Sequence, residues 1–345
     1  MLRVPYDDLY QALLRATRHL GLEGDRAALC ARLFAETTRD GVYTHGLDRF
    51  PRFAEMVANG SIDVAAEPAR VAGAAALERW EGNLGPGNLN AYAAMERAIA
   101  LARQYGLGGV ALANTNHWMR GGAYGWLAAE AGVFAMCWTN TLANLPAWGA
   151  ATPTLGNNPL VIAIPGRAGA NSTGNPGAHV VLDMAMSQFS YGSLAAYSAR
   201  GAQLPVPGGY NAAGELTTDP AAIEASKRAL AIGYWKGSGL SLVLDMLAAM
   251  LSGGLASHQI PRDSTRESGV SQMFLAIDPS SVAASADLDR IAGGILESLR
   301  AAIPVDPARP VRYPGQQTLR LREENLRLGV PVTPEVWARL QALSF

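Results

Sequence analysis

The sequence predicts a mixed α/β protein with one helical domain and one central α/β domain. Residues 1–70 carry apolar residues at helical spacing. Between 71 and 315, short apolar runs alternate with amphipathic segments, as in a sheet covered by helices. The segment 316–345 returns to a helical pattern. We therefore expect one domain formed by 1–70 with 316–345, and a second domain over 71–315.

The bulk composition narrows the class of function. The 345 residues are 49% hydrophobic and 17% charged, and their net charge is −1. Such a chain can build a large core, and a nearly neutral chain has no general attraction for nucleic acid or anionic membranes. No secretory leader and no spanning run of about 18 apolar residues is visible. We expect a soluble, cytoplasmic protein that works on a small molecule.

Cysteine and histidine spacing argues against a disulfide scaffold and against a metal site. Cys30 and Cys137 are the two cysteines, and neither lies in a CxxC motif, so we expect both to be buried small hydrophobic residues. The five histidines show no HxH or HExxH spacing. We expect no metal.

Helices are expected at both ends of the chain. Gly21 and Gly41 are natural stops for the first two helices, and Asn59-Gly60 closes a third. Thr333 stands where it could cap the last helix, with Pro334 at its first position. The expected terminal helices cover 6–20, 26–40, 50–58 and 334–345.

In the middle of the chain, apolar runs of strand length end in polar residues, as strands do where they open into a site. We expect strands within 69–82, 108–117, 133–141, 160–166, 179–187 and 271–278. Helical patterns lie between and after them, and the one at 235–254 is expected to form the longest helix. The other expected helices are 91–106, 125–132, 186–201 and 286–302.

Two glycine-rich segments are candidates for a cofactor site. Residues 85–90 read GPGNLN and lack the third glycine of a dinucleotide-binding fingerprint, so a Rossmann site is rejected. In YWKGSG, Lys236 stands at the start of a long helix, where an anion could bind. The alternative is that Gly237 and Gly239 only shape the turn. The pattern alone leaves both interpretations open.

Polar residues also follow the expected strand at 108–117. The string NTNHWMRGG brings Asn116, His117 and Arg120 together where α/β proteins place ligands. A lone histidine is more often structural, but this company favours a functional His117. Further along, Asn140 can donate and accept hydrogen bonds, whereas Asn157-Asn158-Pro159 is better interpreted as a turn.

His45 and Arg49 lie four residues apart in GVYTHGLDRFPRF. On a helix both side chains would project from one face. A guanidinium can hold a carboxylate with two parallel hydrogen bonds, and an imidazole can transfer a proton near neutral pH. Gly46 weakens a helix at this point, however. Spacing alone favours a local surface pair.

Taken together, the motifs resemble those of the malate/L-lactate dehydrogenase family, which is distinct from the Rossmann-type dehydrogenases. The likeness extends in order from about residue 5 to about residue 343. NHWMRGG and GYWKGSG resemble a branch of this family that reduces a 2-oxo sugar acid. The motifs that carry the resemblance are GVYTHGLDRFPRF, NTNHWMRGGAYGW, CWTNT, PAWGA, VLDMAMS, GAQLP and GYWKGSGLSLVLDM.

The resemblance implies a homodimer and an unusual nicotinamide-binding fold within 71–315. It implies His45 as proton donor, although His117 has that role in some members. We assign Arg49 to the substrate carboxylate and His117 to the carbonyl, with Asn140 as a further substrate contact. The implied cofactor contacts are Val181, Leu182, Asp183, Met184, Ala185, Met186, Ser187, Trp235, Lys236, Gly315, Gln316 and Gln317.

Two departures from close relatives matter. Where relatives read Pro-Gly-His-Glu, this chain has Gln316 and Gln317, so an acid that could contact the cofactor hydroxyls is missing. We expect NADH as cofactor, with NADPH possible. Residues 166–179 form a longer segment than the corresponding turn in relatives. It could reach a partner subunit or the mouth of the site, but we expect an inert surface insertion.

The sequence is also compatible with other functions. The substrate could be another 2-oxo or 2-hydroxy acid, yielding malate, lactate, sulfolactate, ureidoglycolate or a cyclic imino-acid product. The protein could also be a sugar-acid binding module that keeps the fold without the chemistry, although His45, Arg49, His117 and Lys236 together argue against it.

Overall fold

The computed structural model describes residues 2–166 and 179–343, so the surface insertion expected at 166–179 lies, apart from its two end residues, outside the described residues. Among them, the largest sheet has the strand order β2-β3-β4-β12-β5-β8-β9. Only β3 and β4 run parallel in this sheet; its other neighbours are antiparallel. The mixed α/β class is confirmed. The strands are β2 Ala69–Ala74, β3 Leu77–Glu81, β4 Leu107–Asn116, β12 Ser268–Ile277, β5 Phe134–Thr139, β8 Leu160–Ile164 and β9 Val180–Met184.

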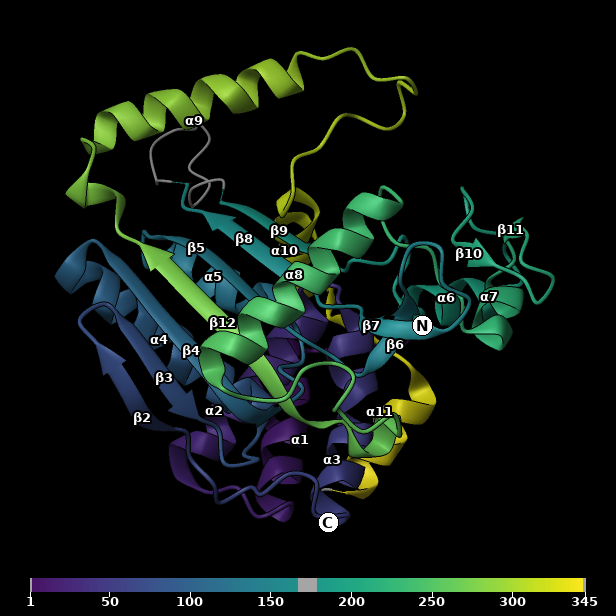
Figure 1. Cartoon of the computed structure of the whole chain (residues 1–345), viewed down its shortest axis with the longest axis horizontal. Helices are drawn as coiled ribbons and strands as arrows, with labels where there is room; N and C mark the ends of the chain where they lie inside the picture. Colours follow the sequence, from purple (N-terminus) through teal and green to yellow (C-terminus); the bar gives the residue numbers. More distant parts are fainter. Residues whose placement is uncertain (1, 167–178, 344–345) are drawn as a thin grey trace.

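Strand β12 comes late in the chain but lies inside the sheet, between β4 and β5 (Figure 1). Its side chains alternate between the two faces, as the geometry of a strand requires. Phe274 packs into the cluster on one face, and Met273 into the cluster on the other. Because β4 and β5 both pair with β12, this strand fixes the positions of their ends relative to each other.

Helices cover both faces of this sheet (Figure 1). α4 (Gly87–Tyr105) and α5 (Gly122–Glu130) share a core with one face, and α8 (Trp235–Ser252) shares a core with the other. The prediction that 235–254 forms the longest helix is wrong, because α4 has 19 residues and α8 has 18. A Cβ at Gly87 would lie 2.1 Å from the Asn116 carbonyl oxygen, so this glycine permits α4 to approach the end of β4.

The two ends of the chain share a separate core. α1 (Tyr6–His19), α2 (Gly24–Arg39) and α3 (Phe50–Ala58) pack with β13 (Val330–Val332) and α11 (Pro334–Ala342). β1 (Leu2–Val4) pairs antiparallel with β13. The predicted stops at Gly21, Gly41 and Gly60 are confirmed, since all three have positive φ.

The last helix departs from the prediction in one detail. Pro334 is its first residue, as predicted, but Thr333 makes no side-chain hydrogen bond to the helix backbone. The Thr333 hydroxyl instead lies 3.5 Å from the Asp48 carboxylate, which it faces as a donor. The cap residue thus contacts the turn before α3 rather than its own helix.

The remaining elements lie around this framework. α6, β10, β11 and α7 form a lobe at one side of the molecule, and α9 lies apart from the sheet (Figure 1). Cys30 and Cys137 are buried and free, as predicted. None of the helices in the described part of the chain is both long and apolar enough to cross a membrane. These elements are α6 Tyr191–Ala199, α7 Pro220–Ser226, α9 Ser285–Arg300, α10 Gln316–Leu328, β6 Ala143–Pro146, β7 Pro153–Gly156, β10 Gly209–Tyr210, β11 Leu216–Thr217, and the 3-10 turns η1 Tyr43–His45, η2 Leu47–Arg49, η3 Ser264–Arg266 and η4 Pro279–Ser281.

Candidate active site

A cavity of about 1030 Å³ brings together segments that are far apart in the sequence. Its walls come from η1 and η2, the loop between β4 and α5, the end of β9, the start of α6, and residues 262–267. Pockets for small molecules and cofactors usually measure about 300–1,000 Å³. This cavity therefore has room for a cofactor and a small substrate together.

His45 and Arg49 both line the cavity, but they do not share a helix. Gly46 separates η1 from η2. A Cβ at Gly46 would lie 2.4 Å from the Thr38 hydroxyl oxygen, which accepts a 2.8 Å hydrogen bond from the Leu47 backbone N–H. The segment thus lies directly against α2, and His45 and Arg49 line the cavity instead of forming the local surface pair that the spacing favoured.

His117 follows β4 and has a defined tautomer. The Met119 backbone N–H donates a 3.0 Å hydrogen bond to its Nδ1. The tight turn that allows this contact places Met119 at φ +63°, a left-handed conformation. Because Nδ1 accepts, a neutral His117 carries its proton on Nε2. His45 is less constrained, since its Nδ1 lies 3.1 Å from the Thr44 hydroxyl, which can donate or accept.

The two imidazoles stack on each other, with ring centroids 5.9 Å apart and an angle of 21° between the planes. Desolvation, followed by the positive charges of Arg49 and Arg120, lowers the pKa of His45 to about 4. Desolvation together with Arg49, His45 and Arg52 lowers the pKa of His117 well below its usual value. Both rings are therefore neutral at neutral pH while the cavity holds no anion.

Positive charge gathers beside the histidines. Within the described residues, Arg49 has one ion pair, and it is long, 3.9 Å from Nη2 to Glu267 Oε2. Desolvation, together with the charge of Arg52, lowers the pKa of Arg49 to about 10. The Nε and Nη2 atoms of Arg52 are buried and have no hydrogen-bond partner among the described residues. Buried donors without acceptors are costly, so this corner of the cavity suits an anion.

The strand that was predicted to hold the cofactor is divided between the cavity and the core. Asp183, Met184, Ala185 and Ser187 line the cavity. Val181 and Met186 are buried in the two hydrophobic clusters, and Leu182 is half-buried outside the lining. Asp183 Oδ2 accepts a 2.8 Å hydrogen bond from the Gly122 N–H, and desolvation raises the pKa of Asp183 although its side chain opens onto the cavity.

The other residues expected at the cofactor lie outside the cavity lining. The Val181 N–H donates a 3.1 Å hydrogen bond to the Pro314 carbonyl, which places Gly315 against the start of β9. Gln316 and Gln317 are the first two residues of α10. Trp235 and Lys236 begin α8 on the surface, and Trp235 is 63% exposed. A Cβ at Gly237 would lie 2.2 Å from the Ile232 carbonyl, which supports the turn-shaping interpretation of this glycine.

Asn140, expected at the substrate, is fully buried. Its amide N–H groups donate to Asp245 Oδ1 and to the Leu255 carbonyl, and its oxygen accepts from the Ser271 N–H. Asn157, interpreted as a turn residue, does line the cavity, and its side-chain oxygen accepts from the Ser187 N–H at 3.0 Å.

Sequence reasoning missed two charged residues of the site. Arg52 lies three residues after Arg49, in the same FPRF string, and that short spacing was a usable signal. Glu267 reaches the cavity only because it immediately precedes β12, and no local pattern indicates that position.

The comparisons with known proteins agree with this architecture. Residues 4–341 match the family model described as malate/L-lactate dehydrogenase. The chain is 43% identical over 342 residues to the 2,3-diketo-L-gulonate reductase of Citrobacter koseri, with 99% of this chain and 100% of the relative covered. Proteins of the same name from Salmonella paratyphi A and Salmonella heidelberg match over the same shares at 43% and 42%.

Known structures show the same fold. The delta1-piperideine-2-carboxylate reductase of Pseudomonas syringae superposes with a TM-score of 0.87 at 26% identity, covering 99% of this chain and 100% of that one. The malate dehydrogenase of Pyrococcus horikoshii gives 0.87 at 25%, covering 99% and 94%. Given the family match over nearly the whole length and relatives above 40% identity, the chain belongs to the malate/L-lactate dehydrogenase family of oxidoreductases.

Proposed function

We propose that this protein uses NADH to reduce the 2-oxo group of a sugar acid, converting 2,3-diketo-L-gulonate to 3-dehydro-L-gulonate. The proposal rests on one observation: the stacked rings of His45 and His117 lie in the same cavity as two arginines that lack close acceptors. These are Arg49, whose ion pair is long, and Arg52, whose Nε and Nη2 have no hydrogen-bond partner among the described residues. An anion site next to two imidazoles suits a 2-oxo acid. The printed names of the relatives at 43% identity indicate the sugar acid.

The cavity walls fit a phosphate-bearing cofactor. Tyr191 and Gly192, the first residues of α6, line the cavity, and the N–H groups at a helix start favour phosphate. Ser193 adds a hydroxyl and Lys227 a positive charge to the same lining. Bound here, the cofactor would supply the hydride, and Asp183 to Ser187 would lie along it.

Arg49 would hold the substrate carboxylate, with Arg52 beside it. A guanidinium forms two parallel hydrogen bonds with a carboxylate, and the long contact to Glu267 leaves Arg49 open to a better partner. The unpartnered donors of Arg52 would gain an acceptor in the same event. This clamp would orient the 2-oxo group toward the imidazoles.

The histidines would divide the work on the carbonyl. His117 carries its neutral-form proton on Nε2, so it would donate a hydrogen bond to the carbonyl oxygen. His45 would deliver the proton. A carboxylate bound to Arg49 offsets one of the charges that lower the pKa of His45. Substrate binding would therefore help to load the proton that the reaction consumes.

The rest of the cavity favours a hydroxylated substrate. Thr141, Asn157, Arg262, Ser264 and Glu267 line it with hydrogen-bond donors and acceptors. A wall of polar groups rejects a substrate that leaves those groups unpaired once water is excluded. A sugar acid would offer hydroxyl groups to the side chains that still have a free donor or acceptor, and pyruvate has no hydroxyl groups to offer.

A panel of oxo acids tests the function. With NADH and NADPH in parallel, nicotinamide oxidation should be fastest on 2,3-diketo-L-gulonate. We expect kcat/KM for pyruvate and oxaloacetate to be lower by at least about tenfold, because one unpaired polar group costs on the order of 1–3 kcal/mol. The purified wild-type protein is assayed by absorbance. Absence of oxidation with every acid would identify a binding module and contradict the proposal.

The carboxylate clamp is tested by Arg49→Lys. A lysine keeps the charge but loses the two-pronged geometry, so kcat/KM on the sugar acid should fall about tenfold to a hundredfold, mainly through KM. Steady-state kinetics measure this. Arg97→Lys is the matched control, because Arg97 binds Glu78 away from the cavity. Equal kcat/KM in Arg49→Lys and wild type would rule Arg49 out as the clamp.

The proton donor is tested by replacing each histidine with glutamine, which keeps an N–H donor but cannot release a proton. His45→Gln should lower kcat by about 10²–10⁴-fold, and His117→Gln by much less. In the wild type, kcat/KM for reduction should fall as pH rises through the pKa of His45 in the free enzyme, which is about 4. The value of kcat should fall at a higher pH, because kcat reports the pKa of His45 in the substrate complex. If only His117→Gln removes this limb, the two roles are reversed.

We also propose a homodimer that buries the outer face of α8. This face is apolar and unusually exposed for a monomer, so a second copy of the chain is the proposed occupant. Its exposed residues are Leu240, Leu242, Val243, Met246, Leu247, Met250 and Leu251.

Met250→Glu tests the dimer. Met250 is 74% exposed, and a charge at that point would be buried without a partner in the interface. Sedimentation should show a dimer for the wild type and a monomer for the variant. Tyr105→Glu, on the helix that covers the opposite face of the sheet, should stay dimeric. A wild type that sediments as a monomer would contradict the proposal.

A further inference from the structure

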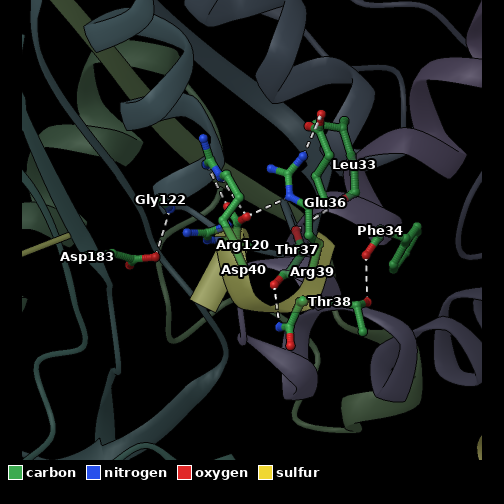
Figure 2. A network of polar contacts seen from close by, with 12 residues as sticks. Leu33, Phe34, Glu36, Thr37, Thr38, Arg39, Asp40, Arg120, Gly122 and Asp183 are labelled. Carbon is green, nitrogen blue, oxygen red and sulfur yellow. Dashed lines mark hydrogen bonds and ion pairs between the residues drawn. The ribbon is translucent and has the colours of Figure 1, made fainter. Parts of the chain in front are cut away.

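Asp40 forms a buried ionic cluster just beyond the cavity. Its carboxylate is 2% exposed and lies after α2. Arg120 Nη1 donates to Oδ2 at 2.7 Å, Arg322 donates to both oxygens at 2.9 and 2.8 Å, and Arg39 Nε donates to Oδ1 at 2.9 Å. Figure 2 shows Arg39 and Arg120 turned toward Asp40.

Arg120 is the member of the cluster that reaches the cavity. It lines the cavity wall, and its positive charge is one of the two that lower the pKa of His45. It also lowers the pKa of Asp183, against the larger effect of desolvation. The charge that His45 experiences from this side is therefore the charge of Arg120, offset by its ion-pair partner Asp40 and, from within the cavity, by Asp183.

The arginines of the cluster differ in how many carboxylates they contact. Arg39 also approaches Glu36 at 3.7 Å, and Arg322 approaches Glu130 at 3.5 Å. Arg120 has no ion-pair partner other than Asp40 within 2–166 and 179–343. Burial acts to raise the pKa of Asp40, but Arg322, Arg120 and Arg39 outweigh it and hold that pKa well below its usual range. Asp40 therefore stays ionised at any working pH.

We propose that Asp40 is a positioning residue, which fixes Arg120 in the cavity wall and offsets its charge, and thereby controls how readily His45 holds a proton. The proposal rests on His45 as the proton donor of the proposed function. The other groups that face His45 are Thr44, Arg49 from η2 and His117 after β4. Arg52 and Glu267 act on it through Arg49.

The cluster also connects His45 to the C-terminal part of the chain. Arg322 belongs to α10 and stacks over Trp126 of α5, 4.9 Å from its ring centroid. Removing the charge of Arg322 would leave more of the Asp40 charge to offset Arg120. Loss of the Asp40 charge and loss of the Arg322 charge should therefore shift the pKa of His45 in opposite directions. Loss of packing alone would not produce opposite shifts.

The test is a chemical-shift titration of the His45 imidazole in the full chain, without cofactor or substrate. Asp40→Asn should lower the pKa of His45 by about 0.5–1 unit, and Arg322→Gln should raise it by about 0.3–0.5 unit. Glu78→Gln is the matched control, because Glu78 is an equally buried carboxylate held by Arg70 and Arg97 away from the cavity. It should leave the His45 titration unchanged.

Opposite shifts in the two variants support the proposal, and no shift or shifts in the same direction overturn it. If Asp40→Asn does not fold, the direction of the Arg322→Gln shift decides. In turnover, the alkaline limb of kcat for Asp40→Asn should move to lower pH, with kcat at neutral pH lower by about 3–10-fold. The titration requires no turnover, so it distinguishes failure of this proposal from failure of the proposed function.

Discussion

Positive charge held against two desolvated imidazoles is the constraint around which the cavity is organised. Arg49 and Arg52 come from one segment and Arg120 from the loop after β4, and their charges act on His45 and His117, while Glu267 lies 3.9 Å from Arg49 and Asp40 lies behind Arg120. Full compensation would make this corner neutral and leave it no preference for an anion. Partial compensation keeps the rings unprotonated while the cavity holds no anion.

The surrounding structure keeps these charges in place. Gly46 lies so close to Thr38 that the turn carrying His45 rests on α2. On the other side, the Met119 N–H sets both the direction and the tautomer of His117. Backbone contacts of this kind determine which ring nitrogen faces the cavity, and they make the two imidazoles unequal although their rings are stacked.

Much of the fold could be predicted from the sequence, since helix stops such as Gly21 and Gly41 and strand-length apolar runs act locally. The family resemblance is confirmed over residues 4–341. Parts of the site could not be predicted, because a position in the cavity depends on distant segments. Glu267 reaches it through strand order, and Asn140 is held in the core by Asp245 and Leu255, which lie more than a hundred residues later. Asp40 and Arg322, which form an ion pair beyond the cavity, are likewise separated by most of the chain.

The central place of β12 has a consequence for synthesis of the protein. The strand that separates β4 from β5 ends at Ile277, so a ribosome-bound chain shorter than this has β4 and β5 without the neighbour that joins them. Contacts between distant segments also form slowly. The nascent chain must therefore keep the apolar strands around Val110 and Cys137 from associating with other chains until β12 emerges. The cavity wall is incomplete until the same stage, because it includes Glu267, the residue directly before β12.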